Sequence, residues 1–358
     1  MDTETQRFRT RGRAALSNHA GRFEQHARVA VSDGWAPEAD LPVLRTQIRV
    51  ERPRKIISYN KSPDLPFDRS INPYRGCEHG CVYCFARPGH AYLGLSPGLD
   101  FETQLISRPE APALLERELG QKRYNVAPIA IGTNTDPYQP IEKEHQIMRQ
   151  CLEVLARYKH PVAIVTKGSL IERDIDILSA MAADDLVRVG ISVTTLDARL
   201  SRLMEPRAPA PLKRLHMIER LSKAGIPVRV AASPMIPALT DPELETILEA
   251  ARQAGADYAS WVMLRLPREV APLFEEWVNA HFADRAKRIL SRVREMHGGA
   301  LYDATWYRRM RGHGPYAELL AQRFNLAVKR HGLQVKAPKL ETQLFRPPRV
   351  RDEQYSLF

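Results

Sequence analysis

Three cysteines fall within eight residues, Cys77, Cys81 and Cys84, in a C-x3-C-x2-C run with Tyr83 directly before the third thiol. The chain has only one further cysteine, Cys151, so these thiols do not form a disulfide framework. Three thiolates can hold three corners of an iron–sulfur cube and leave the fourth iron without a protein ligand. An open coordination position is typical of a catalytic metal site, whereas a structural site has all its positions filled by the protein.

Two other kinds of cysteine site fit the pattern less well than the cube. Structural zinc usually takes four ligands in two C-x2-C or Cys/His pairs; His79 or His90 is available as a fourth ligand, but there is no second pair. A ferredoxin-type cluster needs a fourth cysteine followed by proline, which is absent. Gly76 and Gly80 suit a tight loop around a cube, because residues without Cβ let backbone N–H groups turn toward sulfur.

The bulk composition suits one large domain or a domain with appendages, since 44% of the 358 residues are hydrophobic. No run approaches 18 apolar residues and the N-terminus is polar, so we expect neither a membrane span nor a signal peptide. A cysteine set of this kind suits the reducing cytoplasm. The formal net charge is +11, and residues 285–351 hold 16 Lys/Arg against 4 Asp/Glu. This basic stretch is either a solvated helical face or a surface for phosphates.

The elements that must position the cysteines alternate between strand and helix from about residue 69. A short stretch before the cysteines is followed by five apolar, β-branched runs with helix-length segments between them; the runs are 128–133, 162–166, 187–194, 228–232 and 258–264. Such runs are typical of parallel strands buried on both faces. Six βα units predict an α/β fold, a partial (β/α)6 TIM-type barrel open on one side with a helical C-terminal extension. Ligands are expected at the C-terminal ends of its strands.

The composition divides the chain into four expected segments. The first is rich in Arg with little periodicity, and the third has helical patterns after Pro267. The segments are a basic, largely extended or disordered arm (1–55), the barrel (56–267), a basic helical extension (268–337) and an extended tail (338–358).

Two further stretches, near the ends of the first two predicted parallel strands, add to the information from the cysteine motif. Residues 72–76 (Asn-Pro-Tyr-Arg-Gly) lead into Cys77, and 132–138 (Gly-Thr-Asn-Thr-Asp-Pro-Tyr) end the run that starts at 128. Over residues 69–265 the chain resembles the radical S-adenosylmethionine (SAM) superfamily, in its spore photoproduct lyase-like, DNA repair photolyase-like branch. The resemblance implies a 4Fe–4S cluster on the three cysteines, with SAM on the free iron. It also implies an electron donor and reductive cleavage of SAM to a 5′-deoxyadenosyl radical.

The resemblance also implies which residues hold SAM. Tyr83 is the aromatic residue of the cysteine motif. Asn134 and Asp136 end the second strand and can exchange hydrogen bonds with the ammonium or carboxylate of SAM. Lys167 follows the third strand and can pair with that carboxylate. The alternative is that these residues only cap or form a turn. Asp136, which precedes Pro137, fits a common turn signal.

Three further positions come from the fourth and fifth strands. Ser192 and Thr194 lie on one face of the fourth strand and can reach the SAM carboxylate or the ribose hydroxyls. Met235, with Ile236, would form an apolar wall for adenine after the fifth strand.

One position departs from the lyase pattern. The lyase has a cysteine that donates a hydrogen atom to the repaired thymine radical, and Thr133 stands at the matching position. A threonine O–H bond is much stronger than a thiol S–H bond, so Thr133 cannot readily replace that donor, which argues against spore photoproduct repair. Cys151 lies in the apolar stripe of a predicted helix over 142–158, which indicates a small buried hydrophobe. No catalytic residue follows from the sequence.

Aromatic and basic residues adjoin in the extension. Tyr302, Trp306 and Tyr307 precede 308–311 (Arg-Arg-Met-Arg). Such residues can stack on bases and neutralise phosphates, or form an amphipathic segment packed on the barrel.

The last five residues suggest a protein partner. They resemble the peptides by which bacterial polymerases and repair factors bind the replicative sliding clamp. Gln354 would set the register, and Leu357 and Phe358 would enter an apolar pocket; packing back on the domain is the alternative.

The sequence therefore predicts a cytoplasmic radical SAM enzyme with a 4Fe–4S cluster, acting on nucleic acid in a lyase-like reaction. Radical modification of a protein or small metabolite is one alternative. A metal-containing nucleic-acid-binding module without turnover, with zinc in place of iron, is another.

Overall fold

The computed structural model describes residues 12–24 and 44–347. Its centre is a seven-stranded sheet in the order β10-β9-β8-β7-β6-β3-β2, parallel except for the antiparallel pair β2 and β3. The strands are β2 (Ile57–Tyr59), β3 (Arg69–Ile71), β6 (Ile129–Ile131), β7 (Val162–Thr166), β8 (Val187–Ser192), β9 (Val228–Met235) and β10 (Tyr258–Met263). The six predicted parallel strands of a partial barrel are confirmed, and β2 adds an edge strand.

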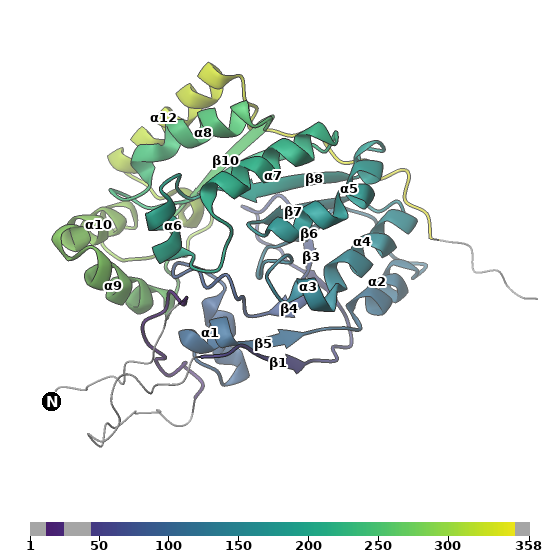
Figure 1. Cartoon of the computed structure of the whole chain (residues 1–358), viewed down its shortest axis with the longest axis horizontal. Helices are drawn as coiled ribbons and strands as arrows, with labels where there is room; N and C mark the ends of the chain where they lie inside the picture. Colours follow the sequence, from purple (N-terminus) through teal and green to yellow (C-terminus); the bar gives the residue numbers. More distant parts are fainter. Residues whose placement is uncertain (1–11, 25–43, 348–358) are drawn as a thin grey trace, which may run out of the picture.

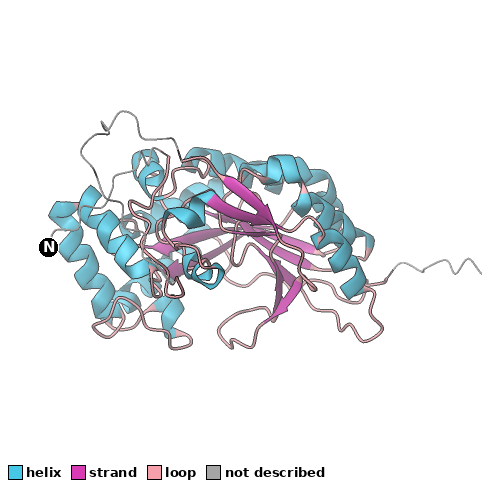
Figure 2. Ribbon diagram, turned by 90° about the horizontal axis from the view of Figure 1, so that it is seen from below, coloured by secondary structure: helices cyan, strands magenta, loops and turns pink. Residues whose placement is uncertain are grey.

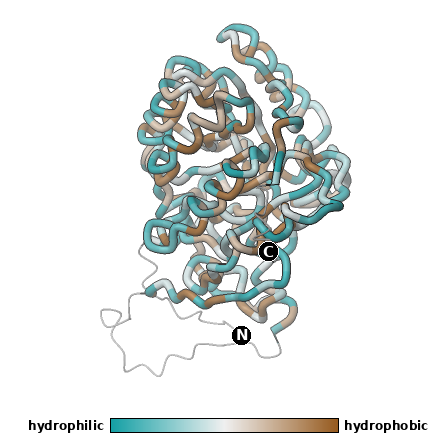
Figure 3. Tube along the Cα trace, turned by 90° about the vertical axis from the view of Figure 1, so that its right-hand side faces the viewer, coloured by the Kyte–Doolittle hydropathy of each residue, from teal (hydrophilic) through white to brown (hydrophobic). Residues whose placement is uncertain are grey.

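Helices cover the outer side of this sheet, as Figure 1 shows. They are α2 (Ala111–Leu119), α3 (Glu142–His145), α4 (Ile147–Arg157), α5 (Ile175–Ala182), α7 (Pro211–Lys223) and α8 (Leu244–Gln253). Helix α6 (Ala198–Met204) instead packs with the cysteine loop and the C-terminal helices. In Figure 3 polar and apolar stretches alternate along the chain, as expected for helices with one buried side. No helix among the described residues is long and apolar enough to cross a bilayer.

The helix predicted over 142–158 is two helices. Gln146 lies between them with φ 50°, in the left-handed region. The buried Glu142 carboxylate accepts the N–H groups of Met148 at 3.0 Å and Arg149 at 3.3 Å, and so satisfies the first turn of α4. Cys151 is fully buried on α4, so its prediction as a small buried hydrophobe is confirmed.

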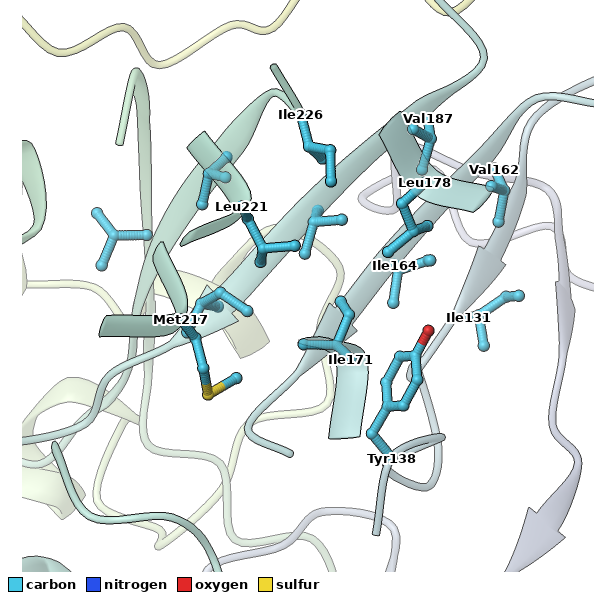
Figure 4. Packing of buried hydrophobic residues seen from close by; sticks show 14 of the residues in the cluster. Ile131, Tyr138, Val162, Ile164, Ile171, Leu178, Val187, Met217, Leu221 and Ile226 are labelled. Carbon is cyan, nitrogen blue, oxygen red and sulfur yellow. The ribbon is translucent and has the colours of Figure 1, made fainter. Parts of the chain in front are cut away.

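The outer face of the sheet is packed, and the inner face is open. On β7, β9 and β10, fully buried residues alternate with residues that are mostly partly exposed. The buried set packs against α5 and α7, with Leu178 and Leu221 near the sheet in Figure 4. In Figure 2 most barrel helices lie on one side of the strands and loops lie on the other.

The inner face shows where the sequence prediction was wrong. Val165 lies on the central strand β7, yet it is 42% exposed. Strands β7, β9 and β10 are therefore not buried on both faces, whereas β6 and most of β8 are, as predicted. The reason is that many of the inward-facing residues are small, namely Ser70, Ala130, Ala163, Gly190, Ser192, Ala231, Ser233 and Ser260. Side chains of this size leave the inner face accessible.

A second sheet joins the arm to the barrel. Its order is β1 (Gln47–Val50), β5 (Gln104–Ser107), β4 (Tyr74–Arg75), with β1 parallel to β5. Arg13 is buried and donates to the Glu102 carbonyl, at 2.7 Å, in α1 (Leu99–Thr103). The described parts of segment 1–55 are thus extended and packed against the body.

The predicted helical C-terminal extension is confirmed. It contains α9 (Val270–His281), α10 (Ala283–Met296), α11 (Arg308–Arg311) and α12 (Pro315–His331). Arg309 forms an ion pair of 2.6 Å with Asp64, in the loop between β2 and β3. Because α11 packs beside β10, this contact joins the two opposite edges of the sheet.

After α12 the chain crosses the N-terminal ends of the strands, drawn in yellow in Figure 1. Gln334 pairs with Tyr258 of β10, and Glu341 N–H donates to the Asp185 carbonyl at 3.0 Å. Arg346 N–H donates to the Tyr158 carbonyl at 3.1 Å. The predicted clamp-binding residues Gln354, Leu357 and Phe358 lie outside the described residues, and their role stays a prediction.

Candidate functional site

The three cysteines follow the short strand β4, which comes directly after β3, the first parallel strand. Cys77 and Cys81 are buried, and Cys84 is half-buried. Gly76 and Gly80 have φ of 76° and 66°, and a Cβ on Gly80 would lie 2.6 Å from Glu102 Oε2. The expected need for glycine at these two positions is confirmed.

A buried ion pair behind the loop holds its backbone. Arg87 is fully buried, and its Nη2 lies 2.5 Å from Oε1 of the equally buried Glu102. The same guanidinium donates to the carbonyls of Gly80 at 3.1 Å and Cys81 at 2.9 Å. Glu102 also accepts N–H groups from the arm at Ala14 and Ala15. This pair fixes the shape of the cysteine loop, and nothing in the sequence marked it.

The protonation of the thiols follows from their position. Burial raises the pKa of Cys77, Cys81 and Cys84. Iron ligation requires thiolates, so loading the site must release these protons. In the described part of the chain, no three or more Cys, His, Asp or Glu side chains are placed around one point to hold a single metal ion. Ligands of a cube bind different irons and need not converge in that way.

The two histidines considered as zinc ligands have other partners. His79 Nδ1 lies 3.3 Å from Asp136 Oδ2, and His90 Nε2 hydrogen-bonds the Gln104 carbonyl at 2.9 Å. Burial lowers the pKa of His90 to about 4. Both rings are therefore engaged in the packing around the cysteine loop.

The end of the second strand carries one satisfied and one free polar side chain. Asp136 accepts from Thr166 Oγ1 at 2.6 Å and from the Lys167 N–H at 2.7 Å. Burial alone would raise the pKa of Asp136, but these donors and His79 hold it below its usual range. Asn134 is exposed, so its side chain is open to a ligand. The predicted SAM contact of Asp136 would have to share oxygens that already accept from the chain.

Three of the predicted residues meet around a buried carboxylate that the sequence analysis missed. Tyr83 donates its hydroxyl hydrogen to Glu205 Oε1, and Thr194 Oγ1 donates to the same oxygen at 2.8 Å. Lys167 Nζ lies 4.0 Å from Glu205 and 5.8 Å from the Tyr83 ring centroid. Arg214 is the buried ion partner of Glu205. The loop after α6 thus brings a negative charge to the strand ends.

The remaining predicted residues differ in access. Ser192 Oγ donates to the Ser233 carbonyl at 3.0 Å, and Thr194 Oγ1 lies 3.0 Å from the same oxygen, which places the two side chains side by side. Met235 is fully buried and packs in the core, so the structure does not present it to an adenine ring. Thr133 is half-buried at the end of β6.

Two buried polar atoms at the same edge of the sheet have no hydrogen-bond partner among the described residues. They are Asn72 Oδ1, one residue after β3, and Ser233 Oγ, near the end of β9. Buried polar groups normally find a partner, so atoms left unpaired at the strand ends fit a site that binds a polar ligand. With the Lys167 ammonium and the accessible Asn134 amide, this donor set fits an amino acid moiety such as that of SAM.

The comparisons agree with this geometry. Residues 71–251 match the Radical SAM superfamily model. A protein of Mycobacterium tuberculosis, described as uncharacterized, is 36% identical over 257 residues, which cover 70% of this chain and 74% of that protein. The chain belongs to the radical SAM superfamily, and membership implies SAM and an iron–sulfur cluster.

More distant proteins share the fold. An uncharacterized protein of Methanocaldococcus jannaschii is 26% identical over 190 residues, covering 53% of this chain and 68% of that protein. Spore photoproduct lyase complexed with dinucleoside spore photoproduct superposes with a TM-score of 0.55 at 14% identity, over 80% of this chain and 81% of the lyase. A mutant lyase with bound AdoMet and the same dinucleoside gives a TM-score of 0.52 at 14% identity, over 80% of both chains. The predicted resemblance to this lyase is confirmed for the fold.

Proposed function

We propose that Cys77, Cys81 and Cys84 hold one 4Fe–4S cluster with an open iron, and that the protein cleaves SAM reductively. The observation that carries this is the position of the cysteine loop, beside the strand ends where Lys167, Ser192 and Thr194 gather. The cluster, when bound, supplies the electron that converts SAM to methionine and a 5′-deoxyadenosyl radical. A reducing compartment such as the cytoplasm suits these thiols.

The chain's own residues bind and orient SAM in this proposal. Lys167 pairs with the SAM carboxylate, and Asn134 accepts from its ammonium group. Ser192 and Thr194 face the ribose or carboxylate, and Tyr83 keeps the Glu205 carboxylate in place. Glu205 in turn limits where the Lys167 ammonium lies, since the two charges attract each other at 4.0 Å.

Anaerobic reconstitution tests this proposal. The protein is loaded with iron and sulfide, reduced with dithionite and given SAM, and 5′-deoxyadenosine is measured. Formation of 5′-deoxyadenosine supports the proposal. Stoichiometric zinc in the purified protein, with no SAM cleavage after iron loading, would favour the metal-containing binding module instead.

Lys167→Met is expected to weaken SAM binding by about 10- to 150-fold, because a charge-assisted contact in a partly dry site contributes about 1.5–3 kcal/mol. Methionine keeps the apolar stem, so packing on Tyr83 is largely retained. SAM affinity is measured by calorimetry on the reconstituted protein, with iron content as a check on the cluster. Lys223→Met, which changes a 74% exposed lysine, is the control. Equal SAM affinity in both variants would remove Lys167 from the site.

We further propose that the substrate is nucleic acid. Trp306 and Tyr307 are 55% and 63% exposed, and Phe85, directly after Cys84, is 45% exposed. The Arg265 guanidinium lies 4.8 Å from the Phe85 ring centroid and donates to Tyr302 Oη at 3.4 Å. Exposed aromatic rings beside arginines suit bases and phosphates. The named substrate of the lyase neighbours is consistent with this class, while Thr133 argues for a different reaction on it.

Some basic residues of the extension are already paired within the protein, such as Arg309 with Asp64. Others, including Lys287 and Arg288 on α10, are exposed. Deleting the extension is not a clean test, because Phe324 of α12 packs on Trp261 of β10 with ring centroids 6.2 Å apart. Substitution of exposed residues avoids this loss of packing.

Lys287→Gln with Arg288→Gln is expected to weaken binding to duplex DNA and to flatten its salt dependence. In a plot of the logarithm of the binding constant against the logarithm of the salt concentration, the slope is negative. Its magnitude should decrease by about 0.9 for each phosphate that the protein no longer neutralises. Lys122→Gln with Arg123→Gln, which removes the same charge from an exposed loop, is the control. Binding that does not respond to salt in the unsubstituted protein would favour a protein or metabolite substrate.

A further inference from the structure

Two arginines lie on the inner face of the sheet without a carboxylate partner among the described residues. Arg188 is on β8 and Arg229 is on the neighbouring β9, where Arg229 pairs with Gly190 in the strand register. Side chains two residues apart share a face, so Arg188, Gly190 and Ser192 point to the same side of β8. Both arginines therefore lie below the strand ends that carry the proposed SAM residues.

Their charges are not neutralised within the part of the chain that the structure describes. Arg188 Nη1 donates to the Pro338 carbonyl at 3.3 Å, and Arg229 Nε is buried without a partner there. Burial lowers the pKa of both guanidinium groups, and Arg188 lowers that of Arg229 further. No carboxylate of residues 12–24 or 44–347 lies near enough to raise either pKa. The two fully buried arginines of the described residues, Arg87 and Arg214, are paired with Glu102 and Glu205.

The register leaves room beside these charges. Across the sheet, Arg229 is flanked by Tyr258 on β10 and by Gly190 on β8, and Gly190 pairs with Val165 of β7. Gly190 has no side chain, and Val165 is 42% exposed. The two arginines thus lie beside an accessible part of the inner face. Tyr258 borders it on one side, and Gly190, which has no side chain, lies on the other.

The site lies close to the proposed chemistry. Ala231 pairs with Ser192, and Arg229 comes two residues earlier on the same strand. Two residues of a strand span about 6.6 Å. Arg188 comes four residues before Ser192, and its guanidinium contacts Pro338 at the N-terminal side of the sheet. A group bound by both arginines would therefore lie on the same inner face as the residues that hold SAM, and nearer the N-terminal ends of the strands.

We propose that Arg188 and Arg229 bind a phosphate group of the substrate on the inner face of the sheet. The planar fork of arginine matches phosphate in a bidentate way, and two adjacent arginines favour a group with more than one negative charge. The assignment of this anion to the substrate rests on the proposed radical function; the binding site itself does not. The phosphate belongs either to a nucleotide of a nucleic acid or to a small phosphorylated metabolite.

The test is calorimetry with the full-length, unreduced protein at low ionic strength. Inorganic phosphate is the first probe, followed by trithymidylate and glucose 6-phosphate. Arg229→Gln and Arg188→Gln are each expected to weaken phosphate binding by about tenfold or more. Arg123→Gln, an exposed arginine of the loop before β6, is expected to change it less than twofold. Thermal unfolding of each variant shows whether it is folded.

The two organic probes separate the sources of the phosphate. Tighter binding of trithymidylate, abolished in Arg229→Gln, supports a nucleotide; tighter binding of glucose 6-phosphate, abolished in the same variant, supports a small metabolite. Unchanged affinity of folded Arg229→Gln and Arg188→Gln for all three probes would overturn the proposal. No step of this experiment requires SAM cleavage, so failure here and failure of the radical function are distinguishable.

Discussion

Replacing any one of Cys77, Cys81 or Cys84 by Ala is expected to abolish iron loading and 5′-deoxyadenosine formation together. Two thiolates do not retain a cube whose fourth iron has no protein ligand. Because the wild-type thiols carry raised pKa values, each substitution removes a small neutral group from the apo protein, and the fold should survive. Iron and sulfide content, the visible absorbance and circular dichroism are measured on each variant.

Cys151→Ala is the matched control, since it also removes a buried thiol. It lies in the core on α4, remote in sequence from the loop, and should cost stability but leave iron content and SAM cleavage unchanged. Loss of the cluster in folded Cys151→Ala, or its retention in Cys81→Ala, would contradict the proposed ligand set.

The second large effect is expected from Arg87→Met. This substitution leaves the fully buried Glu102 carboxylate without its ion partner and frees the carbonyls of Gly80 and Cys81. Breaking a buried pair from one side costs about 3–5 kcal/mol of unfolding free energy. We also expect cluster loading to fall, because the loop between Cys77 and Cys84 loses its support. Chemical denaturation and iron content measure the two effects.

Two further variants separate the ion pair from general damage. Adding Glu102→Gln to Arg87→Met removes the unpaired charge and should recover part of the lost stability. Arg157→Met breaks an exposed pair with Glu116, 49% and 46% exposed, and should cost at most about 1 kcal/mol. If Arg87→Met were as mild as Arg157→Met, the loop would not depend on this pair.

The order of the strands was predictable because apolar runs of strand length recur with helix-length spacing. The open inner face was not predictable in the same way. Ala163, Gly190 and Ala231 count as apolar or neutral in the sequence, but they are too small to cover a sheet. A hydrophobic pattern indicates which side chains avoid water. It does not indicate whether those side chains are large enough to fill the space over a face of the sheet.

The candidate site shows a similar division. Lys167 and Thr194 follow neighbouring parallel strands, so the fold alone brings them to one edge of the sheet. Glu205 lies in the loop after α6, 122 residues from its partner Tyr83, and no spacing rule connects them. Arg87 and Glu102 are 15 residues apart and meet only because the loop folds back on α1. Long-range partners of this kind depend on loop conformation, which the hydrophobic pattern does not encode.

The contact between Arg309 and Asp64 takes the place that strand pairing has in a complete barrel. A closed barrel joins its first and last strands by backbone hydrogen bonds, whereas here hydrogen bonds from Arg309 to Asp64, at 2.7 and 2.6 Å, and from Tyr307 to the same loop connect the edges. The Asp64 side chain is only 2% exposed, so salt should screen this pair weakly. The hydrogen bonds from Arg309 lower the pKa of Asp64, so the pair is complete at neutral pH and is lost only on acidification below the usual carboxyl range. The Arg309–Asp64 contact that joins the two edges of the sheet should therefore depend on pH. Binding of nucleic acid by the exposed basic residues should instead depend on salt concentration.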